Sequence, residues 1–334
     1  MKIVDRRITL RGLAAAGAGL AMPHVARAQA AYPNKPITIY SPAAAGSQSD
    51  VFARVLAIPM QEKFKVPVVV ENRGGAGGVI GTRAAVGAAP DGYALVFGSS
   101  SGFIVAPQLR EPLPYMTPRD LAPIAMTLSG PSIITVQPKL GIKTGEELVA
   151  YLKANPGKLN LGSHGIGSFS HVAMEMFMAE TGTSMAHVPF TGGGPLAQAF
   201  LSQTIDIALF DVLSIGPQVE AGTARVVAQV GEQRSPLFKD IPLVSETVAP
   251  KVKVDYWLGI FAPKATPEPI LELLHKETMA IMATPDNVER VRKASMSTPP
   301  LTRAAFDAKV NNEWEAWGKV IRDRKLGGIG GTVR

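Results

Sequence analysis

Short apolar segments alternate with longer amphipathic segments along most of this chain. Runs rich in Val, Ile, Leu and Phe predict buried strands, whereas apolar positions that recur every three to four residues predict helices. Strands are expected at 37–40, 66–71, 94–97, 124–128, 133–137, 159–161, 186–188, 205–210, 225–230 and 256–262. Helices are expected at 51–63, 79–86, 144–154, 172–180, 195–201, 212–221, 267–283, 286–295 and 303–326. This alternation predicts an α/β fold of mostly parallel sheets flanked by helices.

Two of the turns that lead from a strand into a helix consist mainly of small and hydroxyl residues. Residues 41–50 read SPAAAGSQSD, and residues 162–171 read GSHGIGSFSH. Glycines permit positive φ and leave room for a ligand, and hydroxyls can cap a helix. The free N–H groups of a first helical turn, together with the helix dipole, attract anions. We therefore expect two helix N-termini to face one anionic ligand, and an ordinary capped turn is the alternative.

The order of the elements predicts two lobes. Ser129, Gly130 and Pro131 separate two strands and favour a crossing between lobes, and the strand at 256–262 is expected to cross back. The remaining helices would then cover the first lobe. We expect lobe 1 to comprise residues 31–128 and 256–334, and lobe 2 to comprise residues 129–255.

The N-terminal segment has the pattern of an export signal. Residues 5–11 read DRRITLR and resemble the twin-arginine consensus, and residues 12–22 are too short to span a bilayer. Small residues at 28–30 suit cleavage near Ala30, so residues 1–30 are interpreted as a signal peptide and the mature chain as periplasmic. An uncleaved anchor is the alternative. The net charge of +7 falls to +3 without this segment, because it holds five of the 34 basic residues and one of the 27 acidic residues.

Several classes of site lack their sequence signals. The chain has no Cys, which excludes disulfides, thiolate metal sites and cysteine nucleophiles. No basic cluster alternates with aromatic residues, so nucleic acid is not an expected partner. Ile80 breaks the G-x-G-x-x-G spacing, and His164, His171 and His187 have no carboxylate at ligand spacing. No cofactor and no metal site are therefore predicted.

One motif suggests an enzyme. Residues 98–102 read GSSSG, which matches the G-x-S-x-G motif of serine hydrolases, and Asp211 and His275 follow in the required order. In that motif the serine must lead into a helix, but the β-branched residues and the proline in 103–107 predict poor helix formation. A hydroxyl-rich loop that lines a pocket is the preferred interpretation, and a periplasmic hydrolase using Ser100 is the alternative.

A set of motifs spread over the chain points to a known family. They are YPNKPI at 32–37, VVVENR at 68–73, GAGG at 75–78, APDGY at 89–93, the loop at 162–171, HVPF at 187–190, FD at 210–211 and WEAWGKV at 314–320. In order and spacing they resemble the solute-binding proteins of the tripartite tricarboxylate transporter family, often called Bug receptors. The resemblance implies a two-lobed fold of the type II periplasmic-binding-protein kind. It also implies that two loops hold a ligand carboxylate through backbone amides and bridging waters, and that the receptor delivers its ligand to a membrane permease.

One departure from the family pattern leaves the ligand open. Relatives usually carry a first loop of the form P-F-P-P-G-G, whereas residues 42–47 read PAAAGS. The chain therefore lacks the aromatic residue and the prolines that stiffen that loop. Which carboxylate is bound is not predicted.

The sequence therefore predicts a monomeric binding protein for a small carboxylate, and not an enzyme. The expected partner is a transporter permease, and a sensor of a two-component system is the alternative. With no Arg or Lys in either loop, backbone N–H groups and hydroxyls are the expected donors. The predicted ligand-binding residues are Ala43, Ala44, Ala45, Gly46, Ser47, Asp50, Ser99, Ser100, Ser101, Gly162, Ser163, His164, Gly167, Ser168, His171 and Asp211.

Overall fold

The computed structural model describes residues 32–328, except for the side chain of Leu213. Of these, the residues from Lys35 onward belong to one compact unit, which contains every element named below. The predicted signal peptide lies outside the described residues. In the part of the chain that is described, no helix combines the length and the apolar character needed to cross a membrane.

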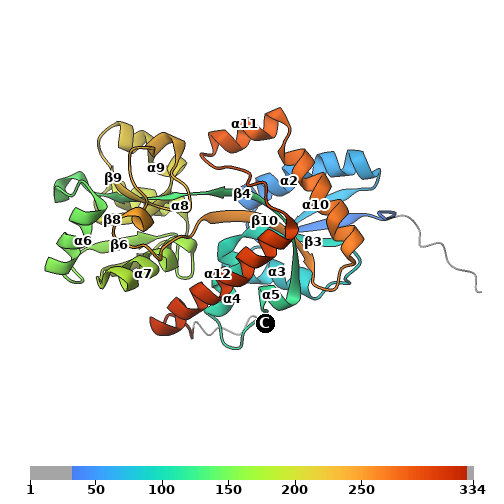
Figure 1. Ribbon diagram of the computed structural model, residues 1–334, viewed down its shortest axis with the longest axis horizontal. Coiled ribbons are helices and arrows are strands. Elements are labelled where there is room, and N and C mark those ends of the chain that lie inside the picture. Colours follow the sequence, from blue (N-terminus) through green and yellow to red (C-terminus); the bar gives the residue numbers. More distant parts are fainter. Residues whose placement is uncertain (1–31, 329–334) are drawn as a thin grey trace, which may run out of the picture. The chain divides into compact units, whose positions relative to one another are not determined.

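Within residues 32–328, ten strands form two five-stranded sheets (Figure 1). The first sheet has the order β2 (Val68–Asn72), β1 (Ile37–Ser41), β3 (Ala94–Ser99), β10 (Tyr256–Pro263), β4 (Leu121–Gly130). The second has the order β7 (Ala186–Pro189), β6 (Asn160–Ser163), β8 (Ile207–Asp211), β5 (Ser132–Val136), β9 (Arg225–Val230).

Each sheet contains one reversed strand. β10 is antiparallel to both of its neighbours, β3 and β4, and β5 is antiparallel to β8 and β9. The other strands of each sheet run in one direction, so the prediction of mostly parallel sheets is confirmed. The reversed strands lie where the chain changes sheets: only Pro131 separates β4 from β5, and β10 pairs Tyr256 with Gly130 as the chain returns. The boundaries of the two lobes, at 128/129 and 255/256, stay a prediction.

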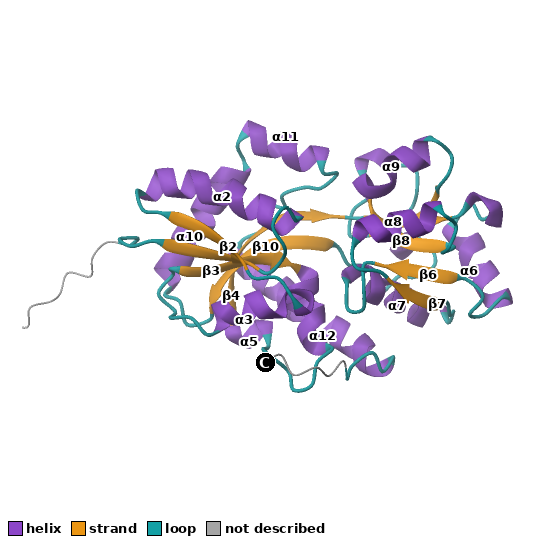
Figure 2. Ribbon diagram, turned by 180° about the vertical axis from the view of Figure 1, so that it is seen from behind, coloured by secondary structure: helices purple, strands orange, loops and turns teal. Residues whose placement is uncertain are grey.

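Helices cover both faces of each sheet. α2 and α10 pack on one face of the first sheet and α3 on the other, and α8 and α9 lie opposite α7 on the second sheet (Figure 2). The α-helices are α2 (Gln48–Phe64), α3 (Val79–Val86), α4 (Ala106–Gln108), α5 (Thr117–Asp120), α6 (Gly145–Ala154), α7 (Phe169–Thr181), α8 (Gly193–Leu201), α9 (Val212–Glu220), α10 (Glu268–Met282), α11 (Pro285–Lys293) and α12 (Arg303–Asp323). The 3₁₀-helices are η1 (Ala76–Gly78), η3 (Pro138–Leu140), η4 (Pro236–Phe238) and η5 (Val244–Glu246), and η2 (Ser101–Val105) is a π-helix.

Serine caps begin the two helices that follow the small-residue loops. The Ser47 side chain accepts a hydrogen bond from the Asp50 N–H, and the Ser168 side chain accepts one from the His171 N–H. Each cap satisfies one of the N–H groups that a first helical turn leaves without a partner. The loops therefore have the capped helix starts that their sequences predict.

The prediction of poor helix formation at 103–107 is wrong. η2 is a single π-helical segment that continues directly into α4. Phe103, Ile104 and Val105 are fully buried, and burial of large apolar side chains outweighs a weak local preference. Pro107 is tolerated inside this continuous helical run because side chains replace its missing N–H. The Tyr115 hydroxyl donates to the Gly102 oxygen and the Thr117 hydroxyl donates to the Phe103 oxygen.

One hydrophobic cluster extends through both sheets. It joins Val96 and Phe261 of the first sheet to Leu161 and Leu209 of the second. α12 contributes Trp314 and Trp317 to the same cluster, and it contacts β4 and α5 on one side and α7 on the other (Figure 2). The two sheets therefore share a core along this side of the molecule.

Candidate functional site

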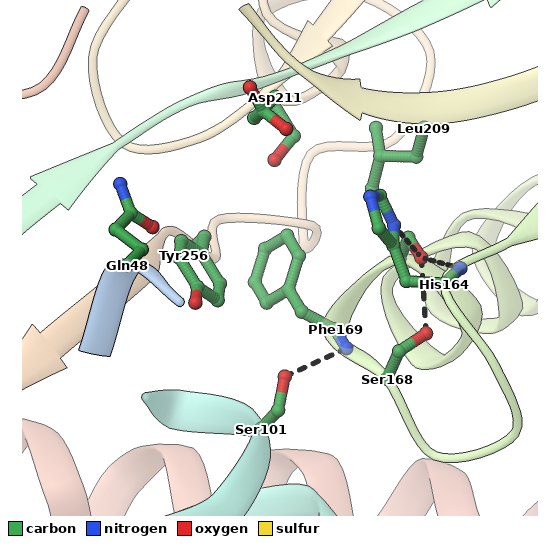
Figure 3. Close-up of a pocket in the computed structure, with 10 residues that line it drawn as sticks. Gln48, Ser101, His164, Ser168, Phe169, Leu209, Asp211 and Tyr256 are labelled. Atoms are coloured by element: carbon green, nitrogen blue, oxygen red, sulfur yellow. Dashed lines mark hydrogen bonds between the residues drawn. The ribbon is translucent and has the colours of Figure 1, made fainter. Parts of the chain in front are cut away.

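A cavity of about 230 Å³ lies where elements of the two sheets meet (Figure 3). The first sheet and its connections supply the residues that begin α2, η2 and β10, and the second supplies the start of β5, the end of β8 and the loop between β6 and α7. The lining residues are Gln48, Ser101, Ser132, His164, Ser168, Phe169, Ser170, Leu209, Asp211 and Tyr256. Ligands of open α/β sheets commonly bind at such carboxyl ends of parallel strands.

A hydrogen bond links the two parts of the molecule at the base of the cavity. The Phe169 N–H, at the start of α7, donates to Ser101 Oγ, at the start of η2, with an N···O distance of 3.0 Å (Figure 3). The Phe169 ring is fixed from both sides, since its centroid lies 5.7 Å from the Tyr256 ring and 5.4 Å from the Trp317 ring. Ser101 and Phe169 therefore hold the cavity wall in one position.

Most N–H groups of the second loop already have acceptors within the loop. The His164 N–H donates to Ser170 Oγ at 3.1 Å, and the Gly165 N–H donates to Ser163 Oγ at 3.2 Å. The Gly167 N–H donates to Nδ1 of the buried His171 at 3.2 Å. A ligand held by these amides would have to replace those acceptors, and the Ser168 hydroxyl is likewise engaged, since it donates to the Gly165 oxygen at 2.7 Å. The Ser101 hydroxyl, which accepts from the Phe169 N–H, is the more accessible donor.

The first loop is also held by a side chain of its own. The buried Asp50 carboxylate accepts hydrogen bonds of 2.8 Å from the Gly46 N–H and of 2.9 Å from Asn72 Nδ2, and it pairs with Arg54 at 2.9 Å. Burial alone would raise the pKa of Asp50, but these donors outweigh it and hold the pKa below its usual value. The Asp50 carboxylate therefore already accepts from the Gly46 N–H, a group that the sequence analysis expected to donate to a ligand.

The histidines near the cavity are neutral. Burial lowers the pKa of His164, although the charge of Asp211 opposes this, and His164 Nδ1 lies 3.0 Å from Ser170 Oγ. His171 and His187 stack with ring centroids 4.0 Å apart, and burial lowers the pKa of each to about 4. An imidazolium is thus not available at neutral pH to hold a carboxylate.

The cavity brings together four of the predicted ligand-binding residues, which are Ser101, His164, Ser168 and Asp211. The others lie in the neighbouring loops and strand ends without lining it: Ala43, Ala44, Ala45, Gly46, Ser47, Asp50, Ser99, Ser100, Gly162, Ser163, Gly167 and His171. The side chains that sequence reasoning missed are Gln48, Ser132, Phe169, Ser170, Leu209 and Tyr256. Gln48 and Ser170 lie inside the two loops already singled out, and Ser132 and Tyr256 begin the strands that change sheets.

The geometry required of a serine hydrolase is missing. Ser100 is fully buried and its hydroxyl has no hydrogen-bond partner. His275 instead places Nδ1 2.8 Å from the backbone oxygen of Ile124 in β4.

Among residues 32–328, no group of three or more His, Asp or Glu side chains could hold a metal ion.

Comparison with known proteins connects this fold and cavity to one family. Residues 52–326 match the model of the tripartite tricarboxylate transporter family receptor. Protein BugT of Bordetella pertussis is 32% identical over 325 residues, which cover 96% of this chain and 98% of BugT.

Two solved structures, one of them the periplasmic binding protein BugD, show the same fold. BugD is 30% identical, with a TM-score of 0.71 over 89% of this chain and 99% of BugD. MatC from Rhodopseudomonas palustris, solved with bound malate, is 26% identical, with a TM-score of 0.73 over 87% of this chain and 100% of MatC. These matches confirm the predicted fold class and the predicted resemblance. The chain belongs to the tripartite tricarboxylate transporter receptor family, whose members are solute-binding receptors and not enzymes.

Proposed function

We propose that this protein is an extracytoplasmic receptor that binds a small carboxylate in the cavity between its two sheets. The observation that carries the proposal is the cavity itself, because its walls come from the carboxyl ends of strands in both sheets. Family membership supports the same function, and malate bound to MatC supports a carboxylate as the ligand.

Hydroxyl groups are the proposed carboxylate donors. Ser101, Ser132, Ser168 and Ser170 line the cavity, and no Lys or Arg does. The positive end of the α7 dipole adds to them, since Ser168 to Ser170 form the start of that helix. We propose that the four predicted residues in the cavity contact the ligand and that the remaining predicted residues shape the loops around it.

The proposal is tested by measuring ligand binding directly. A thermal-shift screen of mono-, di- and aromatic carboxylates, followed by calorimetry, should identify at least one carboxylate that stabilises the protein. Ser101→Ala should weaken its binding by about tenfold or more, as expected for loss of a hydrogen bond to a charged group. Ser202→Ala, at the exposed end of α8, is the matched control and should bind normally. Failure of every carboxylate to bind the wild-type protein would refute the proposed function.

We further propose that the loaded receptor delivers its ligand to a tripartite transporter permease and acts as a monomer. Family membership supports the permease. Co-purification with permease subunits in the presence of ligand would support it, whereas selective capture of a sensor kinase would favour the alternative. Light scattering that gives the mass of a dimer would refute the monomer.

The proposed location is the periplasm, reached through the signal at residues 1–30. Arg6→Lys combined with Arg7→Lys should leave precursor in the cytoplasm, because both arginines belong to the export motif. Cell fractionation with antibody detection measures this. Normal periplasmic accumulation of the double variant would contradict twin-arginine export.

A further inference from the structure

The side chains that line the cavity include an acidic residue and no basic one, which is unusual for a site that accepts an anion. Asp211 is the only acidic residue among the lining side chains, and no Lys or Arg lines the cavity beside it. Burial lowers the pKa of His164 and raises the pKa of Tyr256 to about 12, so both of these side chains are neutral near pH 7. The side chains around the ligand therefore carry a negative charge.

Asp211 has a structural task, but that task leaves part of its carboxylate free. It is the last residue of β8 and the N-cap of α9, where Oδ1 accepts a hydrogen bond of 2.9 Å from the Ser214 N–H. Oδ2 accepts from the Ser214 hydroxyl. A carboxylate offers about four acceptor positions. Asp211 is exposed, and it takes part in none of the ion pairs found within residues 32–328.

Capping alone does not explain why this position carries a charge. Asn and Ser cap a helix about as well as Asp does, and either would leave the cavity neutral. The Asp211 charge reaches the other cavity side chains, because it opposes the effect of burial on the pKa of His164 and adds to the effect of burial on the pKa of Tyr256. Asp211 is thus positioned to act on a bound ligand.

The hydroxyls of Ser101 and Ser168 lie away from this carboxylate, whereas Ser132 is the residue of β5 that pairs with Asp211 in β8. In Figure 3, Asp211 occupies the side of the cavity opposite Ser101, and Ser168 lies on the same side as Ser101. One end of the cavity therefore offers hydroxyls and the N-terminus of α7, which suit an anion, and the other offers a carboxylate, which suits a cation.

We propose that the ligand is an ammonium carboxylate, such as an amino acid, whose ammonium group donates to Asp211 while its carboxylate lies among the hydroxyls near Ser101. This inference rests on the proposed function and narrows it. A dicarboxylate would bring its second negative charge toward Asp211 without any Lys or Arg in the cavity to compensate, and like charges at close range repel.

The test compares matched probes on the full mature protein. Calorimetry is performed with linear amino carboxylates from glycine to 6-aminohexanoate and with the common α-amino acids. Each is paired with three counterparts. They are the monocarboxylate that lacks the ammonium group, the dicarboxylate in which a second carboxylate replaces the ammonium group, and the amine that lacks the carboxylate. At least one amino carboxylate should bind wild type about tenfold or more tightly than its three counterparts, as expected for a charge-assisted hydrogen bond.

Asp211→Asn provides the decisive variant, because asparagine keeps the cap of α9 and removes the charge. It should lose the preference for the amino carboxylate, whereas Asp240→Asn, at an exposed position that does not line the cavity, should keep it. Asp211→Ser repeats the test with a different cap if the asparagine variant folds poorly.

The outcomes separate this inference from the proposed function. A mono- or dicarboxylate that binds wild type as tightly as every amino carboxylate would overturn the inference and leave the carboxylate receptor intact. An amine that binds as tightly as the matching amino carboxylate, or no binding by any probe, would overturn both. Retention of the preference by Asp211→Asn would overturn the role of Asp211.

Discussion

Individual polar residues near the cavity do more to hold the second loop than to contact a ligand. His187 Nε2 lies 2.6 Å from Ser163 Oγ, and the stacked His171 accepts from the Gly167 N–H. Each imidazole must be neutral at the nitrogen that accepts a hydrogen bond. The loop that forms one wall of the cavity therefore depends on an unprotonated Nδ1 of His171, against which His187 stacks.

This dependence predicts acid sensitivity. Both histidines have a pKa of about 4 in the folded protein, below the ordinary value of 6.5. Between pH 6.5 and pH 4 the unfolded chain binds protons that the folded chain does not, so stability should fall as the pH decreases through this range. Since one pKa unit corresponds to about 1.4 kcal/mol, full shifts would make each histidine account for about 2 kcal/mol between pH 7 and pH 4.5. Solvent screening at the half-buried His187 reduces its share, so the expected total loss is about 3–4 kcal/mol.

The measurement is denaturant unfolding of wild type and of a His171→Asn, His187→Gln double variant across this range. Asparagine and glutamine can replace the hydrogen bonds of Nδ1 and Nε2 without titrating. The variant should lose clearly less stability on acidification. Equal losses in the two proteins would show that other groups cause the acid sensitivity.

The helical conformation of η2 depends on hydrogen bonds from residues outside it. The Tyr115 hydroxyl donates to the backbone oxygen of Gly102, and the Thr117 hydroxyl donates to that of Phe103. Gly78, whose φ is +97°, lets its loop approach closely, because a Cβ at this position would lie 3.3 Å from the Gly102 Cα. The glycine-rich segment at 74–78 thus serves close packing against η2.

Tyr115→Phe should destabilise the protein by about 1–3 kcal/mol, because it leaves the buried carbonyl of Gly102 without this donor. Tyr115 is 1% exposed, so water cannot readily replace the hydroxyl. Tyr151→Phe, on α6 and only half-buried, is the control and should change stability by less than about 0.5 kcal/mol. Urea unfolding of both variants measures the two changes in stability. Equal effects of the two substitutions would refute the importance of this hydrogen bond.

At the scale of the whole molecule, the two sheets are joined along one side and separated by the cavity. α12 packs against elements of both sheets, and Arg324, just beyond its end, donates to Glu175 of α7 at 2.8 Å. Lys309 of α12 pairs with Glu232, which follows β9. Any closure over a ligand should therefore be a rotation about this joined side.

Solution scattering tests whether closure occurs. With a saturating carboxylate the radius of gyration should be smaller than without it, because a ligand that contacts both sheets favours the state in which they are closest. A carboxylate that does not bind is the matched control and should leave the radius unchanged. An unchanged radius with the bound ligand would indicate a site that is already closed.

The sequence by itself determined the alternation of strands and helices, the two small-residue loops that precede helices, and the family. These features are encoded locally: apolar period, turn residues and short motifs depend on neighbours within a few positions. The α3 and β9 boundaries were predicted to the residue for this reason. Asp211, which lines the cavity, was also predicted from the sequence, where it lies between a strand and a helix.

Only the tertiary structure decided which groups of the two loops are free to meet a ligand. The Phe169 N–H finds its acceptor in Ser101, 68 residues earlier in the chain, and no local pattern predicts such a pair. Ser132 and Tyr256 enter the cavity because the chain changes sheets beside them, and η2 is helical because Tyr115 and Thr117 reach its carbonyls. Contacts between distant segments depend on how whole elements pack, and packing is decided by burial and hydrogen bonding over the entire core.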